Sequence, residues 1–344
     1  MVRTFQVAGL VFTLDLPDTF PARDHLHNYD PFEVGASPGS QPPETSFGPH
    51  RCASLAVPPL TMPRVARFPG AAAGEAPSFA DVTSPSFADV IGESVFRLTI
   101  TSEPPSGPRE VLFQPKEQAG EPVIGLYRTA TGYLAEFATR PGLPVCGQLA
   151  VSDDFREGRL FAEGDPASQA FAVNNALMLL FAFASAPYRT LEMHASVVVR
   201  GGRGFLFLGR SGTGKSTHSS LWLKHIPGTE LLNDDNPVLR IVDGRARVYG
   251  TPWSGKTPCY KAEDYPVGAI VRLRQAPENR IARLGTVAAY ASVMASCSGF
   301  RPIRTLADAQ HETLAGIAAD VPCYQLDCLP DEAAARLCCE TIDG

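Results

Sequence analysis

The segment from Phe205 to Ser216 constrains this chain more than any other part of its sequence. An apolar run leads directly into the pattern G-x-x-x-x-G-K-S, which begins at Gly209. An apolar strand, this pattern and a following helix are typical of a phosphate-binding loop. Gly212 and Gly214 let the backbone wrap closely around a polyanion, so that successive N–H groups point at phosphate oxygens. A glycine-rich turn with nothing bound is the alternative, but such a turn needs no Lys-Ser pair.

The two residues that end the pattern have expected roles of their own. Lys215 supplies a point charge for the outer phosphates. Ser216 begins the following helix, where its hydroxyl group is placed to hold a Mg²⁺ ion that bridges two phosphates. The amino terminus of that helix adds the positive end of its dipole. Together these donors indicate a triphosphate-sized ligand.

Composition and charge limit the partners and the compartment. The chain has 344 residues, 44% of them apolar, and a formal net charge of −6. Its Lys and Arg residues are scattered, which gives no electrostatic footprint for nucleic acid or an anionic membrane and favours a small molecule or a protein as partner. The eight cysteines show neither paired C-x-x-C spacing nor a dense disulfide pattern, so we expect reduced thiols. The amino terminus lacks an apolar signal core, and we expect a cytoplasmic protein.

One stretch, residues 171–187, is apolar enough to raise the question of a membrane span. It contains Asn174 and Asn175 and is too short to cross a bilayer comfortably. We therefore expect a buried core helix there.

Residues 1–165 are expected to form a β-rich amino-terminal domain. Residues 4–16 have the alternation of one or two strands. A segment rich in Pro, Gly, Ala and Ser follows at about 31–92, and it buries so little apolar surface that we expect a long, partly disordered insertion. A core helix over 167–186, within a connector at 166–190, ends the domain. Further strands are expected at 95–101, 110–114, 123–128, 132–138, 147–151 and 159–161.

Residues 191–344 have the pattern of a nucleotide-binding domain. Strands outnumber helices around the loop, so we expect an α/β (α+β) fold with a mixed rather than all-parallel sheet. The expected strands are 195–200, 204–208, 230–232, 238–242, 246–249, 269–273, 281–284 and 323–326. The expected helices run from the loop to residue 224 and over 286–296, 306–319 and 331–339.

Two features near the loop indicate its chemistry. Asp234 and Asp235 end a short apolar run nineteen and twenty residues after Lys215, where a neighbouring strand would deliver carboxylates to a metal and the terminal phosphate. One carboxylate would hold Mg²⁺ while the other accepts a proton from an attacking hydroxyl group. The alternative is an Asn-Asp-Asp-Asn turn that caps a strand.

His194 directly precedes the expected strand 195–200, and the next strand, 204–208, leads into the loop. A hairpin of these two strands would place His194 at the mouth of the loop. Its imidazole would then either stay charged and stabilise developing phosphoryl charge, or orient the base. A purely structural histidine is the alternative.

These motifs resemble the HPr kinase/phosphorylase and phosphoenolpyruvate carboxykinase superfamily. The resemblance is carried by the His194-led strand pair, the glycine-rich loop, the two acids and the segment Gly-Thr-Pro-Trp-Ser-Gly-Lys-Thr-Pro at 250–258, which looks like HPr-kinase-related proteins of bacteria. It covers residues 191–273, roughly a quarter of the chain, and implies a mixed-sheet P-loop kinase domain. The carboxy-terminal signature of HPr kinase/phosphorylases, their amino-terminal domain and the substrate-binding arginines of carboxykinases have no located counterpart.

The resemblance also implies roles for particular residues. Asp234 would accept the proton near the imidazole, and Ser216 and Asp235 would hold magnesium, although the two acids can exchange roles. Lys256 would face the acceptor or the transition state across the cleft, and Arg272 would neutralise transferred charge; a surface loop and a solvated strand arginine are their alternatives. The ATP phosphates would lie on Gly209, Arg210, Ser211, Gly212, Thr213, Gly214, Lys215, Ser216 and Thr217.

The chain is therefore expected to be an ATP- and Mg²⁺-dependent phosphotransferase whose acceptor is a hydroxyl group of a protein, a peptide or a small molecule. One alternative is a phosphoenolpyruvate carboxykinase-type enzyme, although a catalytic region of about 150 residues leaves little room for an oxaloacetate site. The other is a non-catalytic regulatory module in which ATP switches the shape of the protein. The oligomeric state stays open.

Overall fold

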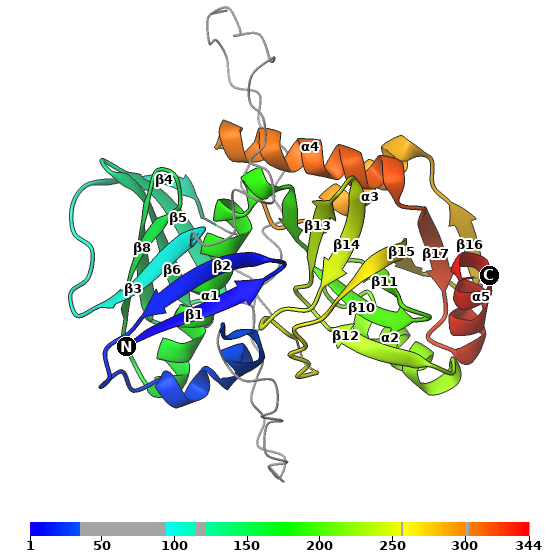
Figure 1. Ribbon diagram of the computed structural model, residues 1–344, viewed down its shortest axis with the longest axis horizontal. Helices are drawn as coiled ribbons and strands as arrows, with labels where there is room; N and C mark the ends of the chain where they lie inside the picture. Colours follow the sequence, from blue (N-terminus) through cyan, green and yellow to red (C-terminus); the bar gives the residue numbers. More distant parts are fainter. Residues whose placement is uncertain (35–93, 115–121, 256, 300–302, 344) are drawn as a thin grey trace, which may run out of the picture.

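The structure is a computed structural model that describes residues 1–34, 94–114, 122–255, 257–299 and 303–343. It has a mixed α/β fold with two mixed sheets, which form two halves of the molecule (Figure 1). Most of the Pro/Gly-rich insertion predicted at 31–92 lies outside the described residues. Its first residues do not, since Pro31 and Phe32 belong to a 3-10 helix and Phe32 is buried.

The first sheet has eight strands in the order β1-β2-β3-β8-β7-β6-β5-β4. Strand β3 pairs in parallel with β2 and with β8, and the other neighbours are antiparallel. All the strands expected between residues 95 and 161 are present. The strands are β1 (Val2–Val7), β2 (Leu10–Asp15), β3 (Phe96–Thr101), β4 (Arg109–Phe113), β5 (Val123–Thr129), β6 (Gly132–Ala138), β7 (Gly147–Ser152) and β8 (Glu157–Ala162). Two 3-10 helices, η1 (Arg23–His25) and η2 (His27–Phe32), follow β2.

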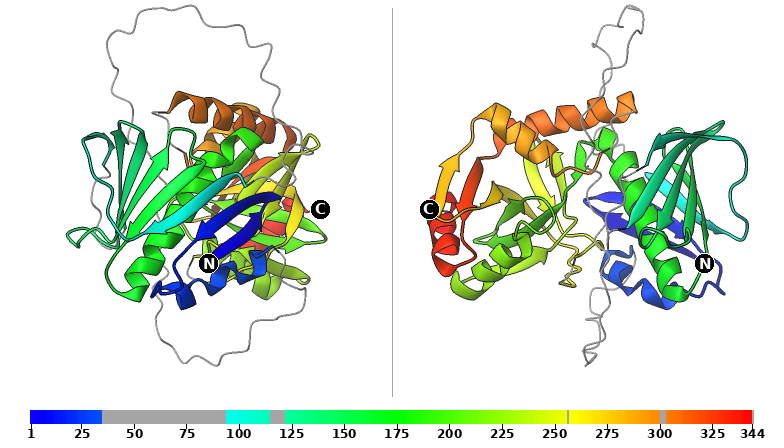
Figure 2. Two further views of the ribbon diagram at one scale, coloured as in Figure 1. Left: turned by 60° about the vertical axis from the view of Figure 1, so that its left-hand side comes forward. Right: turned by 180° about the vertical axis from the view of Figure 1, so that it is seen from behind.

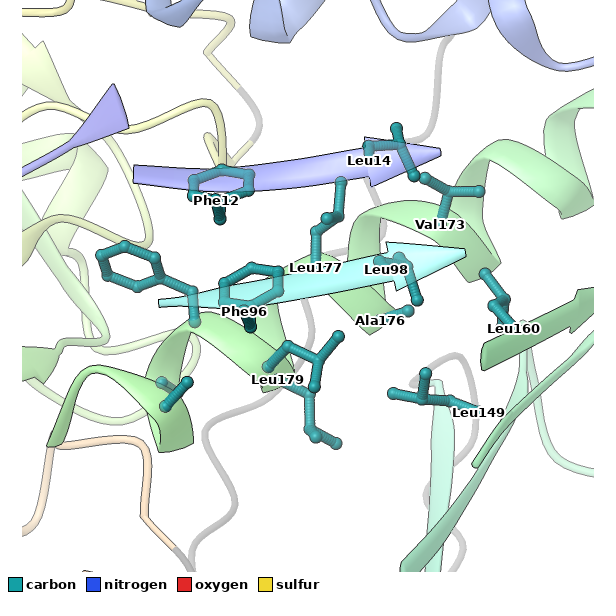
Figure 3. Packing of buried hydrophobic residues seen from close by; sticks show 14 of the residues in the cluster. Phe12, Leu14, Phe96, Leu98, Leu149, Leu160, Val173, Ala176, Leu177 and Leu179 are labelled. Atoms are coloured by element: carbon teal, nitrogen blue, oxygen red, sulfur yellow. The ribbon is translucent and has the colours of Figure 1, made fainter. Parts of the chain in front are cut away.

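Helix α1 (Pro166–Ala184) packs against this sheet. It begins where Asp165 accepts a hydrogen bond from the Ser168 backbone N–H at 2.8 Å and where proline occupies the first turn. The helix is long and apolar enough to cross a membrane by length and composition, but 78% of the window that qualifies is buried inside the fold. The expected core helix is therefore confirmed. Figure 3 shows its packing through Phe12, Leu14, Phe96, Leu98, Leu149, Leu160, Val173, Ala176, Leu177 and Leu179.

The second sheet is mixed, as the sequence predicted. Strand β15 (Asp264–Gln275) pairs in parallel with β11 and β17, and its first residues pair antiparallel with β14. The order is β12-β10-β11-β15-β14-β13-β9, with β17 beside β15 and β16 beside β17. The remaining strands are β9 (Thr190–Glu192), β10 (Ala195–Arg200), β11 (Arg203–Leu208), β12 (Thr229–Asn233), β13 (Val238–Val242), β14 (Arg245–Tyr249), β16 (Arg280–Arg283) and β17 (Cys323–Cys328).

Helices cover both faces of this sheet. Helices α2 (Lys215–His225) and α5 (Glu332–Ile342) pack on one face around Phe205, Phe207 and Trp222. Helices α3 (Thr286–Met294) and α4 (Arg304–Asp320) pack on the other. The right-hand view of Figure 2 shows the two halves side by side, and helix α1, labelled in Figure 1, lies on the side of the first half that faces the second.

Candidate active site

The glycine-rich loop follows β11 and ends at the amino terminus of α2. Gly212 has a φ of +77° and Gly214 a φ of +106°, a region that L side chains rarely adopt. A Cβ atom on Gly209 would lie only 2.9 Å from the side chain of Thr213. The loop therefore makes a tight turn that needs glycine, and it leads straight into Lys215, the first residue of the helix.

Most of the other residues expected to contact phosphate face outward. Arg210 and Ser211 are exposed in the loop, and Ser216 and Thr217 are exposed in the first turn of α2. This leaves their donors accessible to a ligand at the helix amino terminus.

Lys215 points inward instead, and its side chain is part of a buried cluster. Its Nζ donates to the carbonyl oxygen of Gly209 at 3.1 Å and lies 2.6 Å from Nε2 of His194. Burial lowers the pKa of the ammonium group, while the negative charges of Asp235 and Asp234 act in the opposite direction. Since an ammonium group has three donors, one remains for a ligand in this arrangement.

His194 lies beside the loop because β10 and β11 form the predicted hairpin. Ala195 pairs with Leu208, so the residue before β10 is level with the start of the loop. Nε2 of the imidazole is 3.5 Å from Oδ1 of Asp235. Burial and the charge of Lys215 lower the pKa of His194 to about 3. The imidazole is thus neutral near pH 7, which favours the orienting role over the charged one that the sequence left open.

Asp234 and Asp235 directly follow β12, and strand pairing brings them to the loop. Asn233, the last residue of β12, is opposite Val197 of β10. The backbone oxygen of Asp235 accepts the N–H of Ala195 at 2.9 Å. Both acids are only 4% exposed. Of the two acids, Asp235 is the one that the structure shows in contact with the imidazole of His194.

The two acids have different surroundings. Oδ1 of Asp234 accepts the hydroxyl of Ser196 at 2.8 Å, and that hydroxyl is 2.6 Å from the hydroxyl of Ser219 in α2. Oδ2 of Asp234 is buried and has no hydrogen-bond partner among the described residues. Oδ2 of Asp235 accepts Nδ2 of Asn236 at 3.0 Å. Burial raises the pKa of Asp235 to about 6, with the neighbouring lysine opposing the rise and the neighbouring aspartate adding to it.

Glu192 is a third buried acid, which the sequence analysis missed. It ends β9, and its side chain is 2% exposed. Burial raises the pKa of Glu192 well above its usual range, and Asp235 adds to the rise. The Glu-x-His spacing was a usable signal, because residues two apart in an extended segment share a face.

Residues 251–255 lie against the two acids. Nδ2 of Asn233 donates to Oγ1 of Thr251 and to the carbonyl oxygen of Trp253, both at 3.1 Å. A Cβ atom on Gly255 would come within 2.7 Å of the backbone oxygen of Asp234, so a glycine is needed there. The segment that the sequence singled out thus borders the acid pair.

The two remaining expected residues are placed differently. Lys256 lies outside the described residues. Arg272 is half-buried in β15 and is paired with Leu208, which puts its main chain beside the start of the loop. Three residues further on, Gln275 donates to the carbonyl oxygen of Gly212 at 3.2 Å. The end of β15 therefore borders the loop.

The oxygen donors of the site suit a Mg²⁺ ion whose coordination shell is completed by a bound ligand. The hydroxyl of Ser216 and a carboxylate of Asp235 or Asp234 are the oxygen donors that Mg²⁺ prefers, and Oδ2 of Asp234 is a buried acceptor without a partner in the described part of the chain. No group of three His, Cys, Asp or Glu side chains suitable for a metal occurs among the described residues. An ion here would need phosphate oxygens or water to complete its shell.

Comparisons with known proteins add little to this geometry. No protein-family model matches the chain, and no curated protein is similar to it. Among solved structures, that of the Hpr(Ser) kinase/phosphatase from Coxiella burnetii is similar with 14% sequence identity and a TM-score of 0.28, over 44% of this chain and 99% of that chain. A likeness at this level carries no argument about function. Function is therefore inferred from the residues of the site.

Proposed function

We propose that this protein is an ATP- and Mg²⁺-dependent phosphotransferase of HPr kinase-like chemistry that transfers the γ-phosphoryl group to a hydroxyl group. The observation that supports it is the buried cluster of Lys215, His194, Asp234 and Asp235 at the mouth of a glycine-rich loop. Perturbed titratable groups that converge beside an anion-binding turn are typical of a catalytic site.

The loop and α2 would bind the phosphates. Backbone N–H groups of the loop, the helix dipole, the Ser216 hydroxyl and the third donor of Lys215 all favour a polyanion. Mg²⁺ bound by Ser216 and Asp235 would neutralise charge on the outer phosphates. Neutral His194, which contacts Nζ of Lys215 and faces Asp235, would hold both groups in place.

Asp234 is the proposed proton acceptor. Its Oδ1 is held by the Ser196 hydroxyl, which leaves Oδ2 to accept the proton of the attacking hydroxyl group. Arg272 and Lys256 are proposed to balance charge on the transferred group and at the acceptor, which is a protein, a peptide or a small molecule.

Transfer of labelled phosphate tests this function. The protein is incubated with [γ-³²P]ATP, Mg²⁺ and fractions of a cell extract, and label is followed into acid-precipitable protein and into small molecules. We expect Asp234→Asn to bind ATP but to transfer at least about 100-fold less label. Asp243→Asn, a substitution in the exposed β13–β14 turn where Asn tolerates the positive φ, serves as the matched control.

Three results would contradict parts of this proposal. Tight ATP binding without transfer to any fraction would indicate a regulatory module. ATP consumption that depends on oxaloacetate would indicate a carboxykinase. Unchanged transfer by Asp234→Asn would remove Asp234 from the mechanism.

A further inference from the structure

The amino-terminal half makes hydrogen bonds to residues 251–255, the segment that borders the two acids. In η2, the hydroxyl of Tyr29 accepts a hydrogen bond from Nε1 of Trp253 at 2.9 Å. Next to it, Nδ2 of Asn28 donates to the carbonyl oxygen of Pro252 at 2.9 Å and to Oδ1 of Asn174 in α1 at 3.0 Å. Tyr29 is fully buried, and Asn28 is 8% exposed. These bonds are therefore made out of contact with water, where leaving one partner unpaired is expensive.

Trp253 belongs to the core of the first half, although it comes from the second. Its ring lies 5.2 Å from that of Phe181 in α1, measured between centroids. It is part of the same buried apolar cluster as the strands of the first sheet. The indole is therefore fixed by both its ring and its N–H group.

From Trp253 the contact continues to the acids through Asn233. The carbonyl oxygen of Trp253 accepts Nδ2 of Asn233 at 3.1 Å, and Oδ1 of the same side chain accepts the backbone N–H of Asp235 at 2.9 Å. Oγ1 of Thr251 donates to the carbonyl oxygen of Asn236 at 2.7 Å. The turn that carries the acids is thus bonded to the segment that the first half holds.

This turn needs external support. Both acids are buried, each only 4% exposed, and Oδ2 of Asp234 has no hydrogen-bond partner among the described residues. The Asn233 side chain and Thr251 hold the backbone of this turn, and both are hydrogen-bonded to the carbonyl oxygen of Trp253. A local arrangement that is unfavourable by itself persists when its surroundings over-determine it.

We propose that Asn28 and Tyr29 are positioning residues for phosphoryl transfer, acting through Trp253 and Asn233 on the orientation of Asp234 and Asp235. The kinetic part of this inference rests on the proposed function. Asn28 and Tyr29 lie on the side of residues 251–255 that faces the first half, and their contacts do not include the loop that would bind phosphate. Their loss should slow transfer and leave nucleotide affinity unchanged, since misplacement of catalytic groups by even about 1 Å costs about 10²-fold in rate.

Tyr29→Phe tests the proposal with little change in volume. Tyr127→Phe is the matched control, because Tyr127 is a buried tyrosine of the same half whose hydroxyl accepts a bond at 3.3 Å from Gln114, the residue after β4. The reaction measured is loss of the γ-phosphate of Mg·ATP, both to water and to the cell-extract fractions used to test the proposed function. Nucleotide affinity is measured with a fluorescent ATP analogue, and hydrogen exchange reports on the amide of Asp235. A Tyr29→Phe/Asn28→Ser variant provides a stronger perturbation.

We expect Tyr29→Phe to lower kcat about tenfold, to keep nucleotide affinity within about twofold and to speed exchange at the Asp235 amide, whereas Tyr127→Phe changes none of these. The double variant should extend each effect. The proposal would be overturned if Tyr29→Phe and the double variant both behaved like the control in kcat and in exchange. An equal loss of kcat and nucleotide affinity would also overturn it. A wild-type protein that transfers γ-phosphate neither to water nor to any extract fraction, together with faster exchange in Tyr29→Phe, would refute the proposed function and retain the positioning contact.

Discussion

At the scale of single residues, Asp235 and His194 titrate abnormally in opposite directions. Burial raises the pKa of Asp235 to about 6, so the folded protein binds this proton more tightly than the unfolded chain does. Asp235 therefore reduces stability increasingly as the pH rises from about 4 to 6. Burial lowers the pKa of His194 to about 3, so the unfolded chain binds this proton more tightly than the folded protein does. The contribution of His194 to the stability of the fold is therefore lost as the pH falls below about 6.5. The two slopes oppose each other between pH 4 and 6.

Asp235→Asn should remove the pH dependence that comes from Asp235 and leave the one that comes from His194. In the nucleotide-free protein with EDTA, we expect this variant to be more stable than the wild type by about 1–3 kcal/mol at pH 8, because the buried charge is gone. At pH 5 the gain should fall to about half, since much of Asp235 is then already protonated in the folded state. Urea denaturation at both pH values measures this, with Asp243→Asn as the control. A gain that is larger at pH 5 than at pH 8 would contradict the raised pKa.

Gly255→Ala should disturb the acids without touching the glycine-rich loop. The new Cβ atom would lie 2.7 Å from the backbone oxygen of Asp234, closer than these atoms can approach, and 3.0 Å from Cβ of Asp235, which is tight. We expect phosphate transfer to fall at least about tenfold while nucleotide affinity stays within about twofold. Gly285→Ala, at a position with open space, is the control. Parallel loss of affinity would show that residues 251–255 also contact the nucleotide.

At the scale of elements, close packing between α1 and the first sheet fixes the amino-terminal half. A Cβ atom on Gly147 in β7 would lie 2.6 Å from Cβ of Ala172 in α1, and an alanine side chain cannot rotate away. We expect Gly147→Ala to cost about 1–3 kcal/mol by overpacking. Adding Ala172→Gly should recover part of this loss, despite about 1 kcal/mol for a glycine within a helix. Strictly additive losses in thermal or urea denaturation would argue against this contact.

The elements were largely predictable, because their signals are local. Glycines at positive φ, the Gly-Lys-Ser pattern and the hairpin that places His194 are all encoded within about twenty residues. The short strand β9 and its buried Glu192 were missed, because three residues give too little periodicity. The hydrogen bond between Tyr29 and Trp253 was unpredictable in principle from local pattern, since 224 positions separate its partners.

At the scale of the whole molecule, the two halves share one core. Trp253, Val238 and Leu306 come from the second half of the chain but lie in the buried cluster of the first. Arg240 in β13 also donates to the carbonyl oxygen of Ala8 at 2.6 Å. We therefore expect one cooperative unfolding transition for the described parts of the chain.

Trp253→Ala should weaken that coupling. Removing a buried indole costs about 3–5 kcal/mol, and here the lost contacts are those that join the halves. We expect far-UV circular dichroism and tryptophan fluorescence to give coincident urea transitions in the wild type and separated ones in the variant, where Trp222 in α2 is the remaining tryptophan. Separate transitions in the wild type would show that the halves unfold independently.

The central claim is that the glycine-rich loop, Lys215, His194 and the two acids form one site for transfer of a phosphoryl group. The most direct test is loss of the γ-phosphate of Mg·ATP under single-turnover conditions, to water and to acceptors in cell-extract fractions, measured on the wild type and Asp234→Asn alongside their ATP affinities. We expect equal affinity, Mg²⁺-dependent loss of the γ-phosphate in the wild type and a rate at least about 100-fold lower in the variant. Equal rates in both proteins, or ATP binding by the wild type with transfer neither to water nor to any extract fraction, would contradict the claim.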